Sequence, residues 1–182
     1  MSRVIAFLRA INIDGGRTVK MSVLRRLFET LGFSNVATFI GSGNVLFETR
    51  AKNSRILEKK IGKRLRDVLD YEVAVFIRTD VELAKIANYK PFSQSKIDGA
   101  AEFNIVLVGD TLDEKRKQMV AALKTNTDEF RVHGREVYWL RHKKPHGSTF
   151  STVPLEKTLG RATVRCANTV RRLVARYSST KR

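Results

Sequence analysis

The sequence predicts an α+β protein built from two tandem ferredoxin-like (βαββαβ) halves packed as one compact unit, with an extra helix at the C-terminus. In residues 1–80, apolar runs with strand and helix periodicity follow the order β-α-β-β-α-β, which is the ferredoxin-like order. The same order returns in residues 101–182, after a connector at 81–100. A chain of 182 residues is long enough to bury a core in each half.

Each element of the first half has a local sequence signal. The first helix stops at Gly32, and Gly41-Ser42-Gly43 divides two strands as a hairpin turn does. In chain order we expect a strand, a turn, a helix, the two hairpin strands, a helix and a strand, at Val4 to Arg9, Asn12 to Gly16, Met21 to Leu31, Asn35 to Ile40, Asn44 to Glu48, Arg55 to Leu69, and Glu72 to Thr79.

The second half repeats this order without a clear repeat of residues. Its hairpin turns at Gly134-Arg135, and most strands of both halves are apolar on both faces, so each sheet needs cover on two sides. We expect helices to cover one face of each sheet, and either the second repeat of the chain or a partner to cover the opposite face. After a helix and loop over Val81 to Ile97, the expected elements are Glu102 to Val108, Asp113 to Lys124, Glu129 to His133, Glu136 to Arg141, Pro154 to Leu159, Ala162 to Arg165, and Thr169 to Tyr177.

Composition excludes several classes of protein. With 42% hydrophobic and 29% charged residues, the chain is neither fibrous nor disordered, and no apolar run approaches the length of a membrane span. The single cysteine, Cys166, cannot form an internal disulfide and is expected to be structural. We therefore expect a cytoplasmic protein without a membrane partner, and oligomerisation stays open.

The positive charge is concentrated in two segments. Residues 50–66 have a net charge of +7 and residues 131–182 of +11, and the rest of the chain sums to −1, which gives the total of +17. Clustered cations predict a noncatalytic module that binds a polyanion, most plausibly nucleic acid, although a solvated helix face or an acidic protein partner explains the same pattern. The candidate residues are Arg55, Lys59, Lys63 and Arg66 on the first basic helix, and Arg165, Arg171, Arg172 and Arg176 near the C-terminus.

The last helix has its own pattern. Val170, Leu173, Val174 and Tyr177 follow helical spacing and are expected to face the core, which turns the arginines outward. Asn168 is a candidate N-cap for this helix.

A second class of function is a small-molecule binding protein or an enzyme. In a ferredoxin-like half, the end of the first strand lies near the hairpin, which brings Arg9 and Asn12 toward Ser42 and Asn44. These four residues are the candidate ligand site, and the competing interpretation is that the asparagines only bond their own turns.

Other chemistry has weaker support. The run Ile40 to Phe47 matches the scaffold positions of an RNA-recognition motif, but Ser42 and Asn44 stand where that motif has stacking aromatics. Pro145 makes a helical metal-binding pair of His142 and His146 unlikely, and no motif names a catalytic base or a cofactor. We therefore predict no metal and no cofactor, and leave open whether the protein is an enzyme.

Several motifs resemble the domain-of-unknown-function family 1697 over nearly the whole chain. They are Arg9-Ala10-Ile11-Asn12-Ile13, Val19-Lys20-Met21, Leu31-Gly32-Phe33, Ser42-Gly43-Asn44-Val45-Leu46-Phe47, Gly134-Arg135-Glu136-Val137-Tyr138, Leu155-Glu156-Lys157, Leu159-Gly160, and Arg165 followed by Asn168-Thr169-Val170. The resemblance implies two ferredoxin-like halves and supplies no activity. The chain departs from the family at Cys166-Ala167, where the family usually has Asn-Trp, and at Ser148-Thr149, where it has Ser-Lys.

Overall fold

The chain divides into two compact units, Met1–Leu83 and Ala84–Arg182. The computed structural model describes residues 1–9, 11, 18–41, 43–142 and 153–179. Within these residues it has the mixed α+β architecture that the sequence predicts, with one four-stranded antiparallel sheet in each unit.

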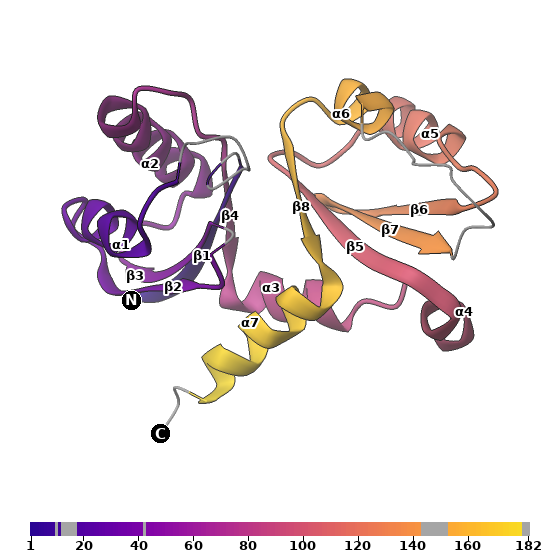
Figure 1. Ribbon diagram of the computed structural model, residues 1–182, viewed down its shortest axis with the longest axis horizontal. Helices are drawn as coiled ribbons and strands as arrows, with labels where there is room; N and C mark the ends of the chain where they lie inside the picture. Colours follow the sequence, from indigo (N-terminus) through magenta and orange to yellow (C-terminus); the bar gives the residue numbers. More distant parts are fainter. Residues whose placement is uncertain (10, 12–17, 42, 143–152, 180–182) are drawn as a thin grey trace. The chain divides into compact units, whose positions relative to one another are not determined.

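The first unit contains four strands and two helices that cover one face of its sheet (Figure 1). The strand order in the sheet is β2-β3-β1-β4, so the first strand lies in the interior of the sheet between β3 and β4. In chain order the elements are β1 (Ser2–Leu8), α1 (Met21–Glu29), β2 (Ser34–Phe39), β3 (Asn44–Thr49), α2 (Ser54–Leu69) and β4 (Val75–Thr79).

The second unit repeats this arrangement. Its sheet has the order β6-β7-β5-β8, and α5 and α6 lie on one face of it (Figure 1). Its elements are β5 (Ala100–Val108), α5 (Glu114–Ala122), β6 (Asp128–His133), β7 (Glu136–His142), α6 (Val153–Leu159), β8 (Ala162–Cys166) and α7 (Ala167–Ser179).

The segment between the two sheets is more helical than the sequence predicts. It contains α3 (Asp80–Asn88) and, where we expected a loop, the short helix α4 (Gln94–Gly99). A capping box starts α3: Thr79 Oγ1 accepts from the Glu82 backbone N–H at 3.2 Å, and Glu82 Oε2 accepts from the Thr79 backbone N–H at 2.8 Å. No helix in the described part of the chain is long and apolar enough to cross a membrane.

Each unit has a hydrophobic core between its sheet and the helices that cover it. In the first unit, residues of alternating position on β1 and β3 meet the apolar stripes of α1 and α2, and Phe33 stacks on Phe47 with ring centroids 4.4 Å apart. In the second unit, Val106, Val137 and Trp139 form the corresponding face of the sheet.

Backbone pairing at the hairpins is the same in both units. The Leu8 N–H donates to the Gly43 carbonyl at 2.8 Å, and the Val108 N–H donates to the Arg135 carbonyl at 3.0 Å. At Gly43, which has a φ of +74°, an added Cβ would lie 3.1 Å from Leu8 Cβ, so this close approach requires glycine.

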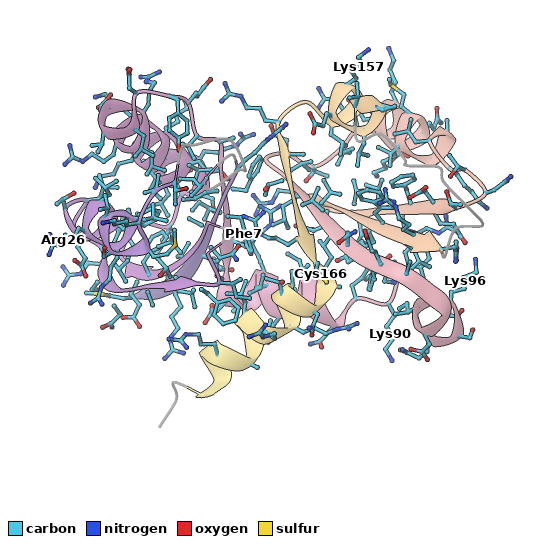
Figure 2. All side chains as sticks on the ribbon, in the orientation of Figure 1. Phe7, Arg26, Lys90, Lys96, Lys157 and Cys166 are labelled. Carbon is cyan, nitrogen blue, oxygen red and sulfur yellow. The ribbon has the colours of Figure 1, made fainter. Side chains whose placement is uncertain are left out.

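The face of each sheet that lies away from its helices is also buried. In the first unit this face includes Ile5, Asn44 and Phe7, the last labelled in Figure 2. A buried arginine lies on this face in each unit, Arg78 with 1% and Arg165 with 8% of its surface exposed. This burial agrees with strands that are apolar on both faces.

On three edge strands, an arginine occupies one backbone carbonyl of its own strand. Arg78, Arg131 and Arg165 each donate Nη1 to the carbonyl of the preceding residue, at 2.8, 3.1 and 2.8 Å. On β4, Glu58 of α2 also accepts from the Ile77 backbone N–H at 3.0 Å. Backbone groups at these edges are therefore occupied by side chains.

Candidate functional site

The basic face of α2 is a row of exposed cations on a helix that the sequence specifies well. Asn53 is the N-cap, and its side chain accepts from the backbone N–H groups of Arg55 and Ile56 at 3.0 and 3.2 Å. The buried stripe is Leu57, Ile61 and Leu65. The helix ends at Asp70, which takes a left-handed conformation with a φ of 59°.

The four predicted cations of α2 are all exposed on the side away from this stripe; they are Arg55, Lys59, Lys63 and Arg66. We call these four residues the α2 ridge. Helical periodicity also puts Ile56 and Val68 toward the apolar face, but they are 60% and 44% exposed, because the buried stripe consists of only three residues, one from each successive turn. Ile56 therefore adds an apolar side chain to the solvent-exposed surface of α2.

Only part of the charge on the α2 ridge is compensated. Lys63 Nζ lies 2.9 Å from Asp67 Oδ2, and this hydrogen bond, with the charges of Lys63 and Arg66, lowers the pKa of the Asp67 carboxyl despite a desolvation effect. Arg55 Nη1 lies 3.9 Å from Glu58 Oε2, but Glu58 is turned to the backbone of β4. Lys59 makes no ion pair with a carboxylate of the described residues.

At the C-terminus, the structure separates the predicted cations into two groups. Arg171, Arg172 and Arg176 are exposed on α7, and Val170 and Leu173 are buried as expected. The Tyr177 side chain lies outside the described residues. Asn168 is not an N-cap, because α7 begins at Ala167 directly after β8 and places Asn168 within its first turn.

Arg165 is a correction to the predicted set of exposed cations. It lies on β8 with 8% of its surface exposed, and its Nη1 donates to Thr163 Oγ1 and to the Val164 carbonyl, both at 2.8 Å. Burial lowers the pKa of Arg165 to about 10. A guanidinium in this position is a buried structural group, and we leave it out of the polyanion surface.

The predicted ligand site at the hairpin edge is only partly described. Asn12 and Ser42 lie outside the described residues. Asn44 is 1% exposed, and its Nδ2 donates to the Phe39 carbonyl at 3.1 Å, which is the local turn bond that we weighed as the alternative. Arg9 continues β1, with its N–H donating to the Ala74 carbonyl at 2.9 Å.

Sequence reasoning missed a buried polar network in the second unit. Asp128 is fully buried and accepts from Trp139 Nε1 at 2.7 Å, Thr127 Oγ1 at 2.8 Å and Arg141 Nε at 3.1 Å. Burial alone raises the pKa of this carboxyl, but the hydrogen bonds and the Arg141 charge outweigh it and lower the pKa. The sequence signal was the alternation that puts Asp128, Phe130 and Trp139 on one face.

Glu129 belongs to a second cluster on the opposite face. Its carboxylate accepts from Lys96 Nζ at 3.0 Å and lies 3.0 Å from His142 Nε2. These contacts, of which the hydrogen bond with His142 has the largest effect, lower the pKa of Glu129 although burial acts to raise it.

Among the residues that the structure describes, no three His, Cys, Asp or Glu side chains form a group able to hold a metal. His146 and Ser148-Thr149 lie outside the described residues, and Cys166 is exposed.

Comparison with known proteins identifies the family. No curated protein matches the sequence. The solved structure of the conserved bacterial protein SP0830 from Streptococcus pneumoniae is similar with a TM-score of 0.70 and 19% identity, over 96% of this chain and 97% of that chain. A family model described as a protein of unknown function (DUF1697) matches residues 1–138. The chain therefore belongs to the DUF1697 family.

Proposed function

We propose that this protein is a noncatalytic polyanion-binding module whose ligand is nucleic acid, held mainly through the α2 ridge. The observation that carries the proposal is that all four cations of the ridge are exposed along one side of a single helix. With a rise of 1.5 Å per residue, Arg55 to Arg66 spans roughly 16 Å, which is enough to meet several phosphates of one strand.

The electrostatics of the ridge support phosphate contacts rather than base recognition. The side chains are long and flexible, and the helix is fixed on its sheet by Glu58, which bonds to β4. The net charge of +17 adds a long-range attraction to any polyanion. We therefore expect weak sequence preference and steep salt dependence.

The exposed arginines of α7 extend the proposal as a second, separate contact. Arg171, Arg172 and Arg176 have the exposure that phosphate binding needs. The alternative, a small-molecule site or enzyme at Arg9, Asn12, Ser42 and Asn44, gains no support from the described residues, since Asn44 is engaged in its own hairpin.

We also propose that each unit is a ferredoxin-like half, and that the protein is cytoplasmic. The sheet orders β2-β3-β1-β4 and β6-β7-β5-β8, with the equivalent hairpin bonds at Leu8 and Val108, support the first statement. The lone cysteine supports the second.

The test is a charge reversal with a matched control. Wild type, Lys59→Glu with Lys63→Glu, and Lys115→Glu with Arg116→Glu are titrated into labelled duplex DNA at about 50 mM salt. Lys115 and Arg116 are also exposed, on α5, so both double variants change the net charge equally. We expect the α2 variant to bind at least tenfold more weakly than the α5 variant. Equal losses would show that only total charge matters, and absence of binding by wild type would refute the function.

A further inference from the structure

A pair of stacked aromatic rings stands at the edge of the second sheet. Tyr89 follows α3, and His133 is the last residue of the edge strand β6. Their ring centroids are 4.2 Å apart with an interplanar angle of 15°, so the rings lie almost parallel. Tyr89 is 38% exposed and His133 is exposed, which leaves aromatic surface in solvent.

The stack rests on a buried aromatic layer. The Tyr89 ring lies 5.0 Å from that of Tyr138, which is 1% exposed and donates its hydroxyl to the Ile86 carbonyl at 3.3 Å. Phe103 packs beside Tyr138, at 6.4 Å between centroids. Because the Tyr89 ring packs against both Tyr138 and His133, a ligand that stacks on this pair binds with little loss of side-chain conformational entropy.

Two exposed cations are close to the stacked residues in the sequence, and one of them, Arg131, also donates Nη1 to the Phe130 carbonyl at 3.1 Å and lies over the Phe92 ring at 5.8 Å from its centroid. Lys90 follows Tyr89 directly and is exposed; Figure 2 shows it near α4 in the second unit. Arg131 lies two residues before His133 on β6, and alternation puts both on the same face. Neither Lys90 nor Arg131 forms an ion pair with a carboxylate in the part of the chain that the structure describes.

The carboxylates on the same face do not oppose an anionic ligand strongly. Glu129 is 7% exposed and is held by Lys96 and His142. Glu136 is also only 7% exposed. These two carboxylates therefore present little negative charge to solvent on this face.

We propose that the Tyr89–His133 pair is a base-stacking site for single-stranded nucleic acid, with Lys90 and Arg131 contacting the flanking phosphates. Every nucleobase has a π-face that can extend a stack of parallel rings, whereas bases inside a duplex are already stacked on each other. The proposal rests on the proposed function for its general attraction to nucleic acid, and it adds a preference for single strands.

The experiment compares two single strands that have the same number of phosphates, one with bases and one without, and a duplex, which has twice as many phosphates, as the third ligand. Single-stranded DNA of about 12 nucleotides, an abasic strand of that length and the corresponding duplex are titrated by fluorescence anisotropy. The proteins are wild type, Tyr89→Leu, His133→Ala and, as the matched control that keeps the ring, Tyr89→Phe. Thermal melts establish that each variant is folded.

We expect wild type and Tyr89→Phe to bind the base-bearing strand about tenfold more tightly than the abasic strand, as stacking of one base allows. Tyr89→Leu and His133→Ala should lose that difference and keep their affinity for the duplex. If Tyr89→Leu does not fold, the His133 ring protons, assigned by comparison with His133→Ala, provide the readout, because a stacked base shifts their NMR signals upfield.

Two results would overturn the inference for different reasons. Equal binding of base-bearing and abasic strands by folded wild type, with no shift at His133, refutes the stacking site and leaves the polyanion proposal intact. Failure of wild type to bind any of the three ligands refutes the proposed function and the stacking site together.

Discussion

Arg78 and Arg165 occupy the same place in the two sheets. Arg78 on β4 pairs with Ile5 of β1, and Arg165 on β8 pairs with Ile105 of β5. Each donates Nη1 to the carbonyl of the residue before it at 2.8 Å. The two units thus share a buried cation on the edge strand next to the central strand, although their sequences show no clear repeat.

The first prediction concerns the cost of burying Arg165. Burial lowers its pKa from its ordinary value to about 10, which corresponds to a cost on the order of 3 kcal/mol while the group is charged. Between these two values the unfolded chain holds a proton that the folded chain has released, so stability from this group rises with pH through that window. Arg165→Met should therefore be at least as stable as wild type at pH 7. Above about pH 10, the free energy of unfolding of wild type should rise relative to that of the variant.

Chemical denaturation of both proteins from pH 7 to 11 measures this difference. Arg171→Met, which removes an exposed arginine of α7, is the control and should show no such trend. A large loss of stability in Arg165→Met that is the same at every pH would contradict the prediction.

The second prediction concerns Asp128. Its charged form is stabilised by Thr127, Trp139 and Arg141, so Asp128→Asn should lower the free energy of unfolding by about 2 to 4 kcal/mol at pH 7. Because the folded pKa lies below the ordinary 3.8, this stabilisation is present above that value and is lost as the pH falls through the folded pKa. The difference between wild type and the variant should shrink below about pH 4.

Trp139 reports on this network directly, since it is the single tryptophan of the chain. Its emission should change in folded Asp128→Asn, where the acceptor of its Nε1 proton is altered. An unchanged spectrum together with unchanged stability would mean that the bond between Asp128 and Trp139 contributes nothing.

The third prediction compares two asparagines near helix starts. Asn53→Ala should cost about 1 kcal/mol, because Asn53 caps α2 with two hydrogen bonds to backbone N–H groups. Asn168→Ala should cost less than about 0.5 kcal/mol, because Asn168 lies within the first turn of α7 and alanine is the better helix former there. Urea denaturation of the two variants tests the order, and a larger loss in Asn168→Ala would reverse it.

The fourth prediction separates the two basic surfaces. Arg172→Glu with Arg176→Glu should leave the fold nearly intact, since both residues are exposed on α7. If α7 contacts phosphates, the double substitution makes the plot of log affinity against log salt shallower by about 2 units of slope, because two phosphate contacts are lost. Affinity and slope equal to wild type would remove α7 from the binding surface and leave the α2 ridge.

The sequence predicts the order of helices and strands well. For the sheet face away from the helices, it predicts that the face is covered but not that an arginine is buried there. Short apolar runs and glycine positions identify β1 and both hairpins to within a few residues. The charge count, however, treats every arginine as exposed, and Arg165 is buried because alternation puts it on the face away from α5 and α6. The strands that are apolar on both faces already required that face to be covered.

The sequence does not predict the stacking of Tyr89 on His133, for a different reason. Tyr89 and His133 are 44 residues apart in the sequence, and neither belongs to a motif. Their contact depends on where the chain after α3 meets β6. Hydrophobic periodicity predicts which face of a helix or strand is buried, whereas contacts between residues far apart in the sequence depend on the tertiary structure.

The occupied backbone groups on the edge strands β4, β6 and β8 have a consequence for crowding. Proteins that gather along a polymer of phosphates reach local concentrations far above those in free solution, and open strand edges would then pair between neighbouring molecules. In this chain, Arg78, Arg131 and Arg165 occupy carbonyls of three edge strands, and Glu58 occupies a backbone N–H of one of them. These occupied backbone groups cannot pair with a strand of a neighbouring copy, which opposes aggregation through β4, β6 and β8 wherever the protein is crowded.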